Sequence, residues 1–269
     1  MTIDDPVAGD GGQKENRQAF LLRYIERNHY ISIDEITRLF SVTTQTARRD
    51  VMALEQSGKV RRLHGGAAIA TPVDPVTYRQ RRVDNAPQKE RIGAMVAELI
   101  PDGAAVFIDT GTTCEAIANA LVRRRDLRVV TYSLRVATIL SENSNFVLAV
   151  PGGFVRPVDG GVFREDTAEF IRKFKFDYAI ISVSGIDDDG DICDDDHAEV
   201  AAVSAALAQS DQTLLAVDSS KFGKRALVKL GSLQDVDILV TDLLPDGPVL
   251  HKLGESNIKV HVGKLHPDR

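Results

Sequence analysis

The chain has 269 residues, of which 43% are hydrophobic and 27% are charged, and its formal net charge is −6. This composition predicts a globular protein with one large domain and one small one, and it excludes a chain that is basic throughout. No apolar run approaches the roughly 20 residues of a membrane helix, and residues 1–13 lack the layout of a signal peptide, so we expect a cytoplasmic protein.

The charge is divided unevenly along the chain. Residues 14–66 contain ten lysines and arginines against six aspartates and glutamates, so the remainder carries a net charge of about −10. Only the N-terminal part is therefore suited to binding a polyanion such as DNA.

Two helices are predicted before residue 43. Residues 17–28 place four apolar side chains on one helical face, namely Phe20, Leu21, Tyr24 and Ile25. Ser32 and Glu35 have the spacing of a capping box, which opens a short second helix. A tight turn at residues 40–42 separates this helix from the next one.

A third helix is expected to begin after Thr43, whose hydroxyl can cap it. Residues at spacings of three and four predict one buried stripe, formed by Ala47, Val51 and Leu54. The polar side of the helix carries Arg48 and Arg49 and can enter a DNA major groove.

A basic ribbon follows this helix. Gly58 ends the helix, and residues 59–64 are extended and basic, which predicts a recognition helix with a wing. The alternative is a small helical bundle whose arginines serve only solubility, but the capping box, the tight turn and the ribbon favour a winged helix-turn-helix. The expected DNA contacts are Thr43, Thr44, Gln45, Thr46, Arg48, Arg49, Arg61, Arg62 and His64.

Residues 71–88 are predicted to be a linker, because they contain Pro72, Pro75 and Pro87 and show little periodicity. Residues 78–82 are compatible with one helical turn. This turn would carry three arginines, Arg79, Arg81 and Arg82. One interpretation is that they touch DNA or a partner domain, but we favour a solvated hinge.

From residue 89, helices alternate with short apolar strands. We expect helices at 91–100, 114–122 and 200–208, and strands at 104–108, 129–131, 146–150, 178–183, 213–217, 238–240 and 258–262. Strands this apolar predict a mostly parallel sheet covered on both faces, and hence an α/β domain. Ligands of such sheets bind beyond the carboxyl ends of the strands.

The predicted strand at 104–108 runs directly into the loop 109–113, DTGTT, and then into a helix. Backbone N–H groups, hydroxyls and a helix N-terminus converge there and suit a phosphate group, although an ordinary strand-to-helix turn is the alternative. Other strand ends carry glycines, hydroxyls and two cations, which suit a phosphorylated, hydroxyl-rich ligand. They are Ser133, Gly152, Gly153, Arg156, Gly160, Gly161, Ser184, Gly185 and residues 218–223.

The run VTTQTARRDVMALEQSGKVRRLHGGA at residues 42–67 closely resembles the helix-turn-helix signature of the DeoR family of bacterial transcriptional repressors. Thr43, Ala47 and Val51 stand where serine, isoleucine and leucine are usual. The threonine keeps a capping hydroxyl, and the other two stay apolar with less volume.

The later stretches resemble the sensor domain of the same family, so the resemblance spans about residues 16–244. It implies a fold similar to ribose-5-phosphate isomerase and CoA transferases, and it implies binding of a phosphorylated metabolite. FIDTGTT at 107–113 matches the family's phosphate loop, VDSSKFG at 217–223 matches its lysine loop, and the chain looks most like repressors of glycerol-3-phosphate utilisation. The expected effector ligands are Asp109, Thr110, Gly111, Thr112, Thr113, Ser133, Gly152, Gly153, Arg156, Gly161, Ser184, Gly185, Glu199 and Lys221.

The loop at 193–200 departs from that subfamily, because it lacks an aromatic residue and places His197 two residues before Glu199. Ligand identity is therefore open. Crowded carboxylates beside His197 and Cys193 suggest a metal site as an alternative, but Asp196 and Glu199 have the spacing of a capping box, so we expect no metal and no cofactor. Glu199 is also placed to reach a sugar hydroxyl.

We therefore expect a ligand-released DNA-binding repressor and not an enzyme. Its expected parts are a disordered N-terminus at 1–13, a winged helix-turn-helix at 14–70, the linker at 71–88 and a sensor domain at 89–269. The alternatives are a sugar-phosphate isomerase-like enzyme with an appended helical domain, or a DeoR-type regulator that answers to a different sugar phosphate. Because one recognition helix reads only a few base pairs, we expect a homo-oligomer, either a dimer or a tetramer.

Overall fold

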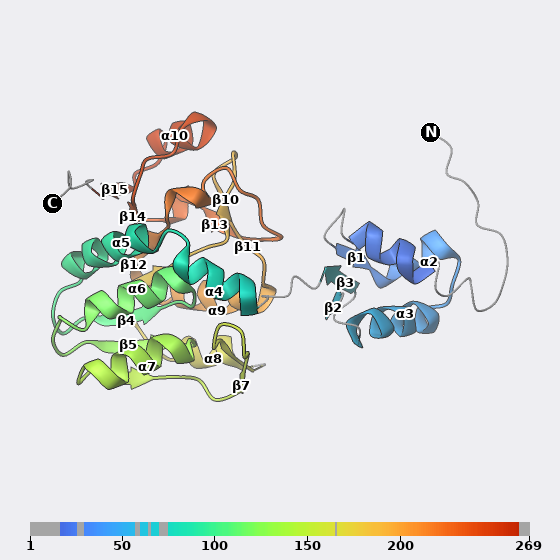
Figure 1. Ribbon diagram of the computed structural model, residues 1–269, viewed down its shortest axis with the longest axis horizontal. Helices are drawn as coiled ribbons and strands as arrows, with labels where there is room; N and C mark the ends of the chain where they lie inside the picture. Colours follow the sequence, from blue (N-terminus) through green and yellow to red (C-terminus); the bar gives the residue numbers. More distant parts are fainter. Residues whose placement is uncertain are drawn as a thin grey trace. The chain divides into compact units, whose positions relative to one another are not determined.

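A computed structural model describes residues 17–25, 30–56, 60–63, 66–69, 75–164 and 166–263 (Figure 1). The chain forms two compact units, Met1–Pro72 and Val73–Arg269. Among the described helices, none is long and apolar enough to cross a membrane.

The first unit is a small helical domain with a three-stranded antiparallel sheet. Residues 17–25 are helical and precede its other elements. These are β1 (Tyr30–Ser32), α2 (Ile33–Phe40), α3 (Thr44–Gln56), β2 (Val60–Leu63) and β3 (Gly66–Ile69), with the strand order β1-β3-β2. The helices and the sheet share one core, to which Leu21, Ile36, Ala47, Val51 and Val60 contribute.

The predicted capping box is confirmed at the start of α2. The backbone N–H of Glu35 donates to Ser32 Oγ at 3.1 Å, and the backbone N–H of Ser32 donates to Glu35 Oε2 at 2.9 Å. At the other end of α2, Ser41 adopts a left-handed conformation with φ of 50° and turns the chain towards α3. Strand β1 was not predicted, because three residues are too few to show an alternating pattern.

The second unit is built on a seven-stranded sheet in which every pairing is parallel. In spatial order its strands are β15 (Lys259–Val262), β14 (Ile238–Thr241), β12 (Ser210–Ala216), β9 (Phe176–Ile181), β4 (Ala105–Ile108), β5 (Arg128–Thr131) and β6 (Val147–Ala149). All seven strands predicted from residue 89 onwards are confirmed and belong to this one sheet.

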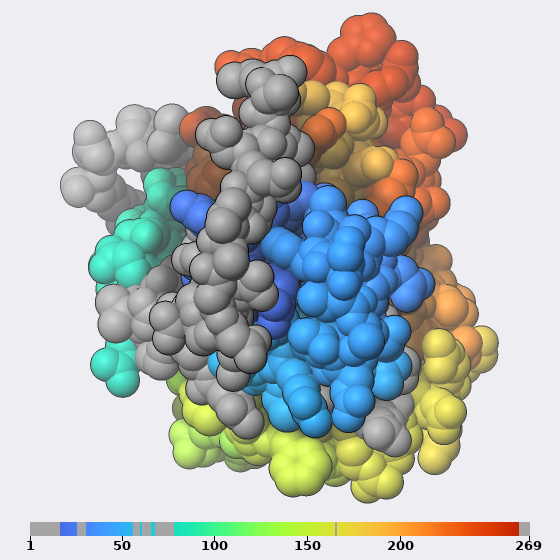
Figure 2. Space-filling model, turned by 90° about the vertical axis from the view of Figure 1, so that its right-hand side faces the viewer, coloured from blue at the N-terminus to red at the C-terminus, as the bar shows by residue number. Residues whose placement is uncertain are grey.

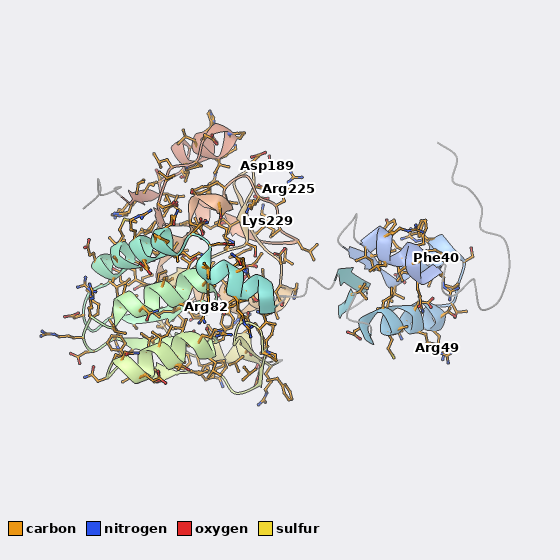
Figure 3. The ribbon with its side chains drawn as sticks, viewed as in Figure 1. Phe40, Arg49, Arg82, Asp189, Arg225 and Lys229 are labelled. Carbon is orange, nitrogen blue, oxygen red and sulfur yellow. The ribbon has the colours of Figure 1, made fainter. Side chains whose placement is uncertain are left out.

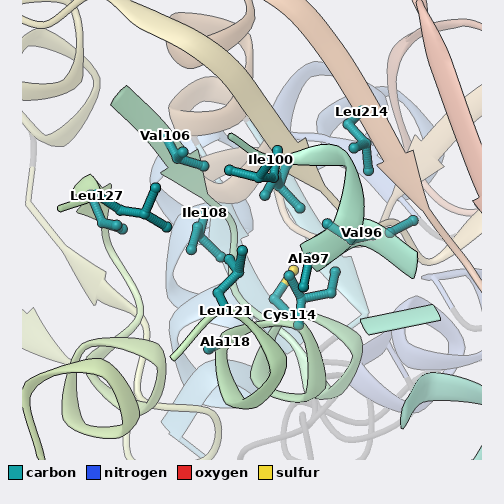
Figure 4. Packing of buried hydrophobic residues seen from close by; sticks show 14 of the residues in the cluster. Val96, Ala97, Ile100, Val106, Ile108, Cys114, Ala118, Leu121, Leu127 and Leu214 are labelled. Atoms are coloured by element: carbon teal, nitrogen blue, oxygen red, sulfur yellow. The ribbon is translucent and has the colours of Figure 1, made fainter. Parts of the chain in front are cut away.

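Helices cover both faces of the sheet, which makes the second unit the expected α/β domain (Figure 1). On one face lie α5 (Ala86–Leu99), α6 (Thr112–Leu121) and α7 (Leu134–Asn143). On the other lie α8 (Thr167–Ile171), α9 (His197–Leu207) and α10 (Gly247–Gly254). Successive residues of β4 alternate between the two cores, with Val106 and Ile108 packed against α5 and α6 (Figure 4) and Phe107 on the opposite side.

Short strands extend the chain around this sheet. One small antiparallel sheet consists of β7 (Phe154–Val155) and β8 (Val162–Phe163). A second has the strand order β10 (Gly185–Ile186), β11 (Asp191–Asp194) and β13 (Val228–Ser232).

In the large sheet, the chain builds outwards from β4 through β5 and β6 on one side and from β9 through β12, β14 and β15 on the other. The point where this order reverses lies between β4 and β9, and such a switch point leaves a crevice at the carboxyl ends of the strands.

The range expected as a linker, 71–88, differs from that expectation in the structure. Helix α4 (Pro75–Val83) and the start of α5 fall within it. Tyr78 is only 2% exposed, and its hydroxyl donates to Glu115 Oε1 on α6 at 2.6 Å. Two of the prolines that suggested a linker begin helices instead: Pro75 is the first residue of α4 and Pro87 lies in the first turn of α5, where a missing N–H costs nothing.

Candidate DNA interface and effector site

Helix α3 begins with the cap that the sequence predicts. The backbone N–H of Thr46 donates to Thr43 Oγ1 at 3.2 Å, and the N–H of Ala47 donates to the Thr43 carbonyl at 2.9 Å. The hydroxyl oxygens of Thr43 and Thr46 are 3.0 Å apart. These two threonines therefore fix the start of the helix, in addition to any contact with DNA.

The two faces of α3 differ as its sequence predicts. Ala47 and Val51 are fully buried and Leu54 is nearly so. The opposite face stays open to solvent and carries Thr44, Gln45, Arg48 and Arg49. Figure 3 labels Arg49 on the outer side of α3, and Figure 2 shows the first unit's surface in blue. Two exposed arginines beside a glutamine and a threonine are suited to hydrogen-bonding base edges and phosphates.

Asp50 is a buried residue of α3 whose positioning role the sequence analysis did not predict. It is 1% exposed, and it accepts hydrogen bonds from Arg17 Nε at 2.6 Å and Gln18 Nε2 at 3.0 Å. This buried ion pair ties α3 to the helix at 17–25 and so fixes the direction of the exposed arginines. The signal was available, because Asp50 is three residues after Ala47 and four before Leu54, and a carboxylate on a buried stripe needs a partner.

The predicted wing is a hairpin of β2 and β3. Arg61 and Arg62 lie in β2, in register with Ala68 and Ala67 of β3. Their side chains, and the whole of His64, lie outside the described residues. Their expected contacts with DNA phosphates therefore remain a prediction.

In the second unit, Asp109 braces the loop that follows β4. It is 2% exposed, and its carboxylate accepts hydrogen bonds from the Tyr132 hydroxyl, from the N–H of Thr110 at 2.7 Å and from the N–H of Ser182 at 3.3 Å. Burial raises the pKa of Asp109 to about 7, and the Tyr132 hydrogen bond opposes this shift. Since Ser182 follows β9, Asp109 joins the two strand ends on either side of the switch point.

The rest of the predicted phosphate loop leads into α6. Gly111, with φ of 113°, stands directly before the helix, while Thr112 and Thr113 form its first turn. A side chain is strained at that φ, so the glycine allows the loop to turn sharply. Thr110 is 6% exposed, and its Oγ1 has no hydrogen-bond partner among the described residues. An unpartnered hydroxyl beside a helix N-terminus is chemically suited to an anion.

The neighbouring strand ends have mainly structural roles. Ser133 is fully buried, caps α7 by accepting from the N–H of Val136 at 3.3 Å, and forms a bridge with Gly161. Gly152 and Gly153 precede β7, and the positive φ of Gly153, 151°, suits glycine. The structure thus brings Ser133 and Gly161 together. At the end of another strand, the Ser184 hydroxyl donates to Asp194 Oδ1 at 2.7 Å, and Gly185 begins β10.

Arg156 is already surrounded by carboxylates. Its guanidinium binds Asp196 Oδ2 at 2.7 Å and also binds Asp159 and Glu199, and its Cζ lies 4.8 Å from the centre of the Phe163 ring. These carboxylates already occupy the donors of the guanidinium and compensate its positive charge. Arg156 is therefore better suited to positioning Glu199 than to meeting a phosphate, which differs from the role expected for it.

The expected capping box at the start of α9 is only half formed. Asp196 accepts from the N–H of Ala198 at 2.7 Å, whereas Glu199 turns away from the helix end and binds Arg156. Burial and the charge of Asp194 raise the pKa of Glu199 to about 8, although Arg156 opposes the shift. Together with Asp194, Glu199 supplies acceptor oxygens that suit the hydroxyls of a ligand.

Lys221 remains available for an anion. It lies in the 3-10 helix η1 (Ser219–Lys221) after β12, and in the described part of the chain its ammonium group forms no hydrogen bond or ion pair. Burial lowers the pKa of Lys221, an effect that Asp218 opposes and the positive charge of Arg81 increases. Arg81 was not among the expected effector ligands.

Family models match both units of this chain. The DeoR-like helix-turn-helix domain matches residues 17–73, and the DeoR C terminal sensor domain matches residues 84–243. The chain belongs to the DeoR family. As a DeoR family member it carries the DNA-binding and sensor parts in the order that its motifs predict.

Similar proteins include several repressors. The glycerol-3-phosphate regulon repressor of Escherichia coli K12 is 37% identical over 250 residues, which cover 93% of this chain and 99% of that protein. The glycerol-3-phosphate regulon repressor of Haemophilus influenzae is 40% identical, and the match covers 91% of this chain and 95% of that protein. The HTH-type transcriptional repressor CsqR of Escherichia coli K12 is 38% identical, and the match covers 89% of this chain and 92% of that protein. A ribose 5-phosphate isomerase A from Methanocaldococcus jannaschii aligns with 52% of this chain and 55% of its own, at 12% identity and a TM-score of 0.39.

These relatives and the helix-turn-helix match decide between the two function classes. The DeoR family member is a DNA-binding transcriptional regulator and not an enzyme. The alternative of an isomerase-like enzyme is thereby set aside.

The raised pKa of Asp109 predicts a pH-dependent stability. Between about pH 4, the ordinary pKa of an aspartate, and pH 7, the folded protein keeps a proton that the unfolded chain releases. The free energy of unfolding should therefore fall as pH rises through this window. Asp109→Asn should reduce the fall, whereas Asp211→Asn, at an exposed site, should not. Urea unfolding at pH 5 and pH 7.5 measures this, and an equal fall in all three proteins contradicts it.

Proposed function

We propose that this protein represses an operon for glycerol-3-phosphate or carbohydrate utilisation and leaves its operator when a phosphorylated polyol or sugar binds the second unit. Glycerol 3-phosphate is the effector we favour. The observation that carries the proposal is the near full-length similarity to two glycerol-3-phosphate regulon repressors, together with both DeoR family matches. As a DNA-binding regulator it would act in the cytoplasm.

The chemistry of the switch point supports an effector of this kind. Thr110, the start of α6 and Lys221 offer donors and positive charge, which suit a phosphate group. Asp194 and Glu199 offer carboxylate oxygens, which accept hydrogen bonds from hydroxyls. Glycerol 3-phosphate has a phosphate at one end and two hydroxyls at the other, so it matches both halves.

Release of DNA requires the effector to prefer the protein state that fits the operator badly. A coupling of about 1–3 kcal/mol would weaken operator affinity roughly 5- to 150-fold at saturating effector. Fluorescence anisotropy of labelled operator DNA with and without glycerol 3-phosphate measures this. Glycerol and inorganic phosphate are the controls, since each carries only one half of the ligand. If no phosphorylated sugar or polyol weakens binding, the sensor function is wrong.

We also propose that the repressor acts as a homo-oligomer. One α3 helix contacts only a few base pairs, which is too little to select an operator in a genome, so at least two subunits should bind repeated half-sites. Sedimentation velocity at micromolar concentration should show a dimer or a tetramer. A monomer that still binds its operator tightly would contradict this.

A further inference from the structure

Helix α4 is fixed against both sides of the candidate effector site. Tyr78 and Arg82 bind Glu115 near the start of α6, with Arg82 Nε 2.7 Å from Glu115 Oε2; Figure 3 labels Arg82 on α4. Just after α4, Asn85 Nδ2 donates to Asp218 Oδ1 at 3.0 Å, and Asp218 caps the turn that carries Lys221. The α4 segment therefore reaches from the phosphate loop's helix to the lysine turn.

Two guanidinium groups lie against the Tyr78 ring. The Cζ atoms of Arg81 and Arg135 are 5.3 Å and 5.2 Å from the ring centroid. Arg135 stands in the first turn of α7, two residues after Ser133, and its Nη2 donates to the Val158 carbonyl at 3.0 Å. These contacts hold both cations beside Tyr78, whose hydroxyl binds Glu115 of α6.

Each of these arginines leaves a buried donor unused. Of the four buried side-chain nitrogen or oxygen atoms that lack a hydrogen-bond partner in the described ranges, three are Arg81 Nε, Arg135 Nε and Thr110 Oγ1. Arg135 Nε is 3.9 Å from Glu115 Oε1, which is too long for a hydrogen bond. Buried polar atoms are normally satisfied. Two of these three belong to arginines that lie against Tyr78, which binds α6, and the third belongs to Thr110 just before α6, so together they indicate a ligand that carries acceptor oxygens.

Arg81 lies four residues before Asn85, whose side chain binds Asp218 at the start of the Lys221 turn, and the positive charge of Arg81 contributes to the lowered pKa of Lys221. Within the described segments, neither cation forms an ion pair with a carboxylate. An anion bound near both would replace their repulsion with attraction.

We propose that Arg81, assisted by Arg135, is a ligand of the effector's phosphate group and completes the site formed by Thr110, the start of α6 and Lys221. The proposal rests on the function proposed above and names two ligands that the expected site did not contain. Because α4 is the first described element after Met1–Pro72 along the chain, an effector held by Arg81 acts on the segment that leads from the DNA-binding unit into the sensor.

The test compares Arg81→Gln with Arg79→Gln. Glutamine keeps part of the stem and removes the charge, and Arg79 is an exposed arginine on the same helix. Isothermal titration calorimetry of the full chain with glycerol 3-phosphate and with inorganic phosphate gives the Kd values. We expect Arg81→Gln to raise both roughly 10- to 100-fold, as for loss of a charge-assisted hydrogen bond, and Arg79→Gln to change them by about twofold or less.

The outcomes separate this inference from the proposed function. Equal Kd values for wild type and Arg81→Gln overturn it, as does a loss of operator affinity without any change in ligand affinity. If wild type binds phosphate in an Arg81-dependent way but not glycerol 3-phosphate, the ligand assignment stands and the proposed effector is wrong. If wild type binds neither, both proposals fail. Thermal unfolding without ligand shows whether Arg81→Gln has a folding defect. If it has one, Arg135→Gln replaces it in the test, and the same rise in both Kd values is expected.

Discussion

Replacing Arg48 and Arg49 together by alanine is expected to weaken specific operator binding strongly at physiological salt. Both side chains lie on the exposed side of α3, whereas Ala47 and Val51 hold the helix in its core. Each arginine that reads a base contributes about 1–3 kcal/mol of discrimination, so losing two such contacts weakens binding by roughly 2–6 kcal/mol. If one of them contacts a phosphate instead, the slope of log affinity against log salt falls by about 1.

Anisotropy titrations at several salt concentrations distinguish these two contributions. The matched control is the double variant Arg23→Ala and Arg38→Ala. Both arginines are exposed and lie in the first unit, and their replacement removes the same charge as the replacement of Arg48 and Arg49. A comparable loss in the control would mean that net charge alone drives binding. Unchanged affinity in the Arg48 and Arg49 variant would remove α3 from the DNA interface.

The sequence predicted the large sheet well because parallel strands buried on both faces are continuously apolar. Each of the seven expected strands lies in that sheet. The paired segments β7, β8 and β10 have only two residues each, which is too short for any periodicity, so the pattern could not show them. Helix α4 was expected only as one turn at 78–82 within a linker, since prolines at helix starts look the same in sequence as prolines in a linker.

The candidate site was predictable only where its residues are neighbours in sequence. The loop from Asp109 to Thr113 could be located because strand, loop and helix follow one another. Arg156 was expected to meet a phosphate, but Asp196 and Glu199, 40 and 43 residues further along, engage its guanidinium. Pairing across such a separation depends on the fold. Arg81 was interpreted as part of a solvated hinge for the same reason, because only the folded chain links the end of its helix to the turn that carries Lys221.

Lys221→Ala should separate effector response from DNA binding. The side chain is in the second unit and lies beyond the carboxyl end of β12, so the first unit and its α3 face are untouched. Without effector the variant should bind operator as tightly as wild type. Its affinity for glycerol 3-phosphate should fall by about 1.5–3 kcal/mol, the range for a hydrogen bond to a charged group. Roughly 10- to 100-fold more effector would then be needed for release.

The control is Lys224→Ala, which removes an equal charge from an exposed position on the same loop. Operator affinity is measured across an effector titration for wild type and both variants. Linkage adds an independent check, because operator DNA must weaken effector binding by the same factor by which effector weakens operator binding. If the lysine only binds the phosphate, saturating effector should weaken the operator affinity of Lys221→Ala by the same factor as that of wild type. If the lysine also favours the released state, the factor should be smaller in Lys221→Ala. The same release curve for Lys221→Ala and wild type would exclude Lys221 from the site, whereas a shift shared with Lys224→Ala would indicate a nonspecific effect of loop charge.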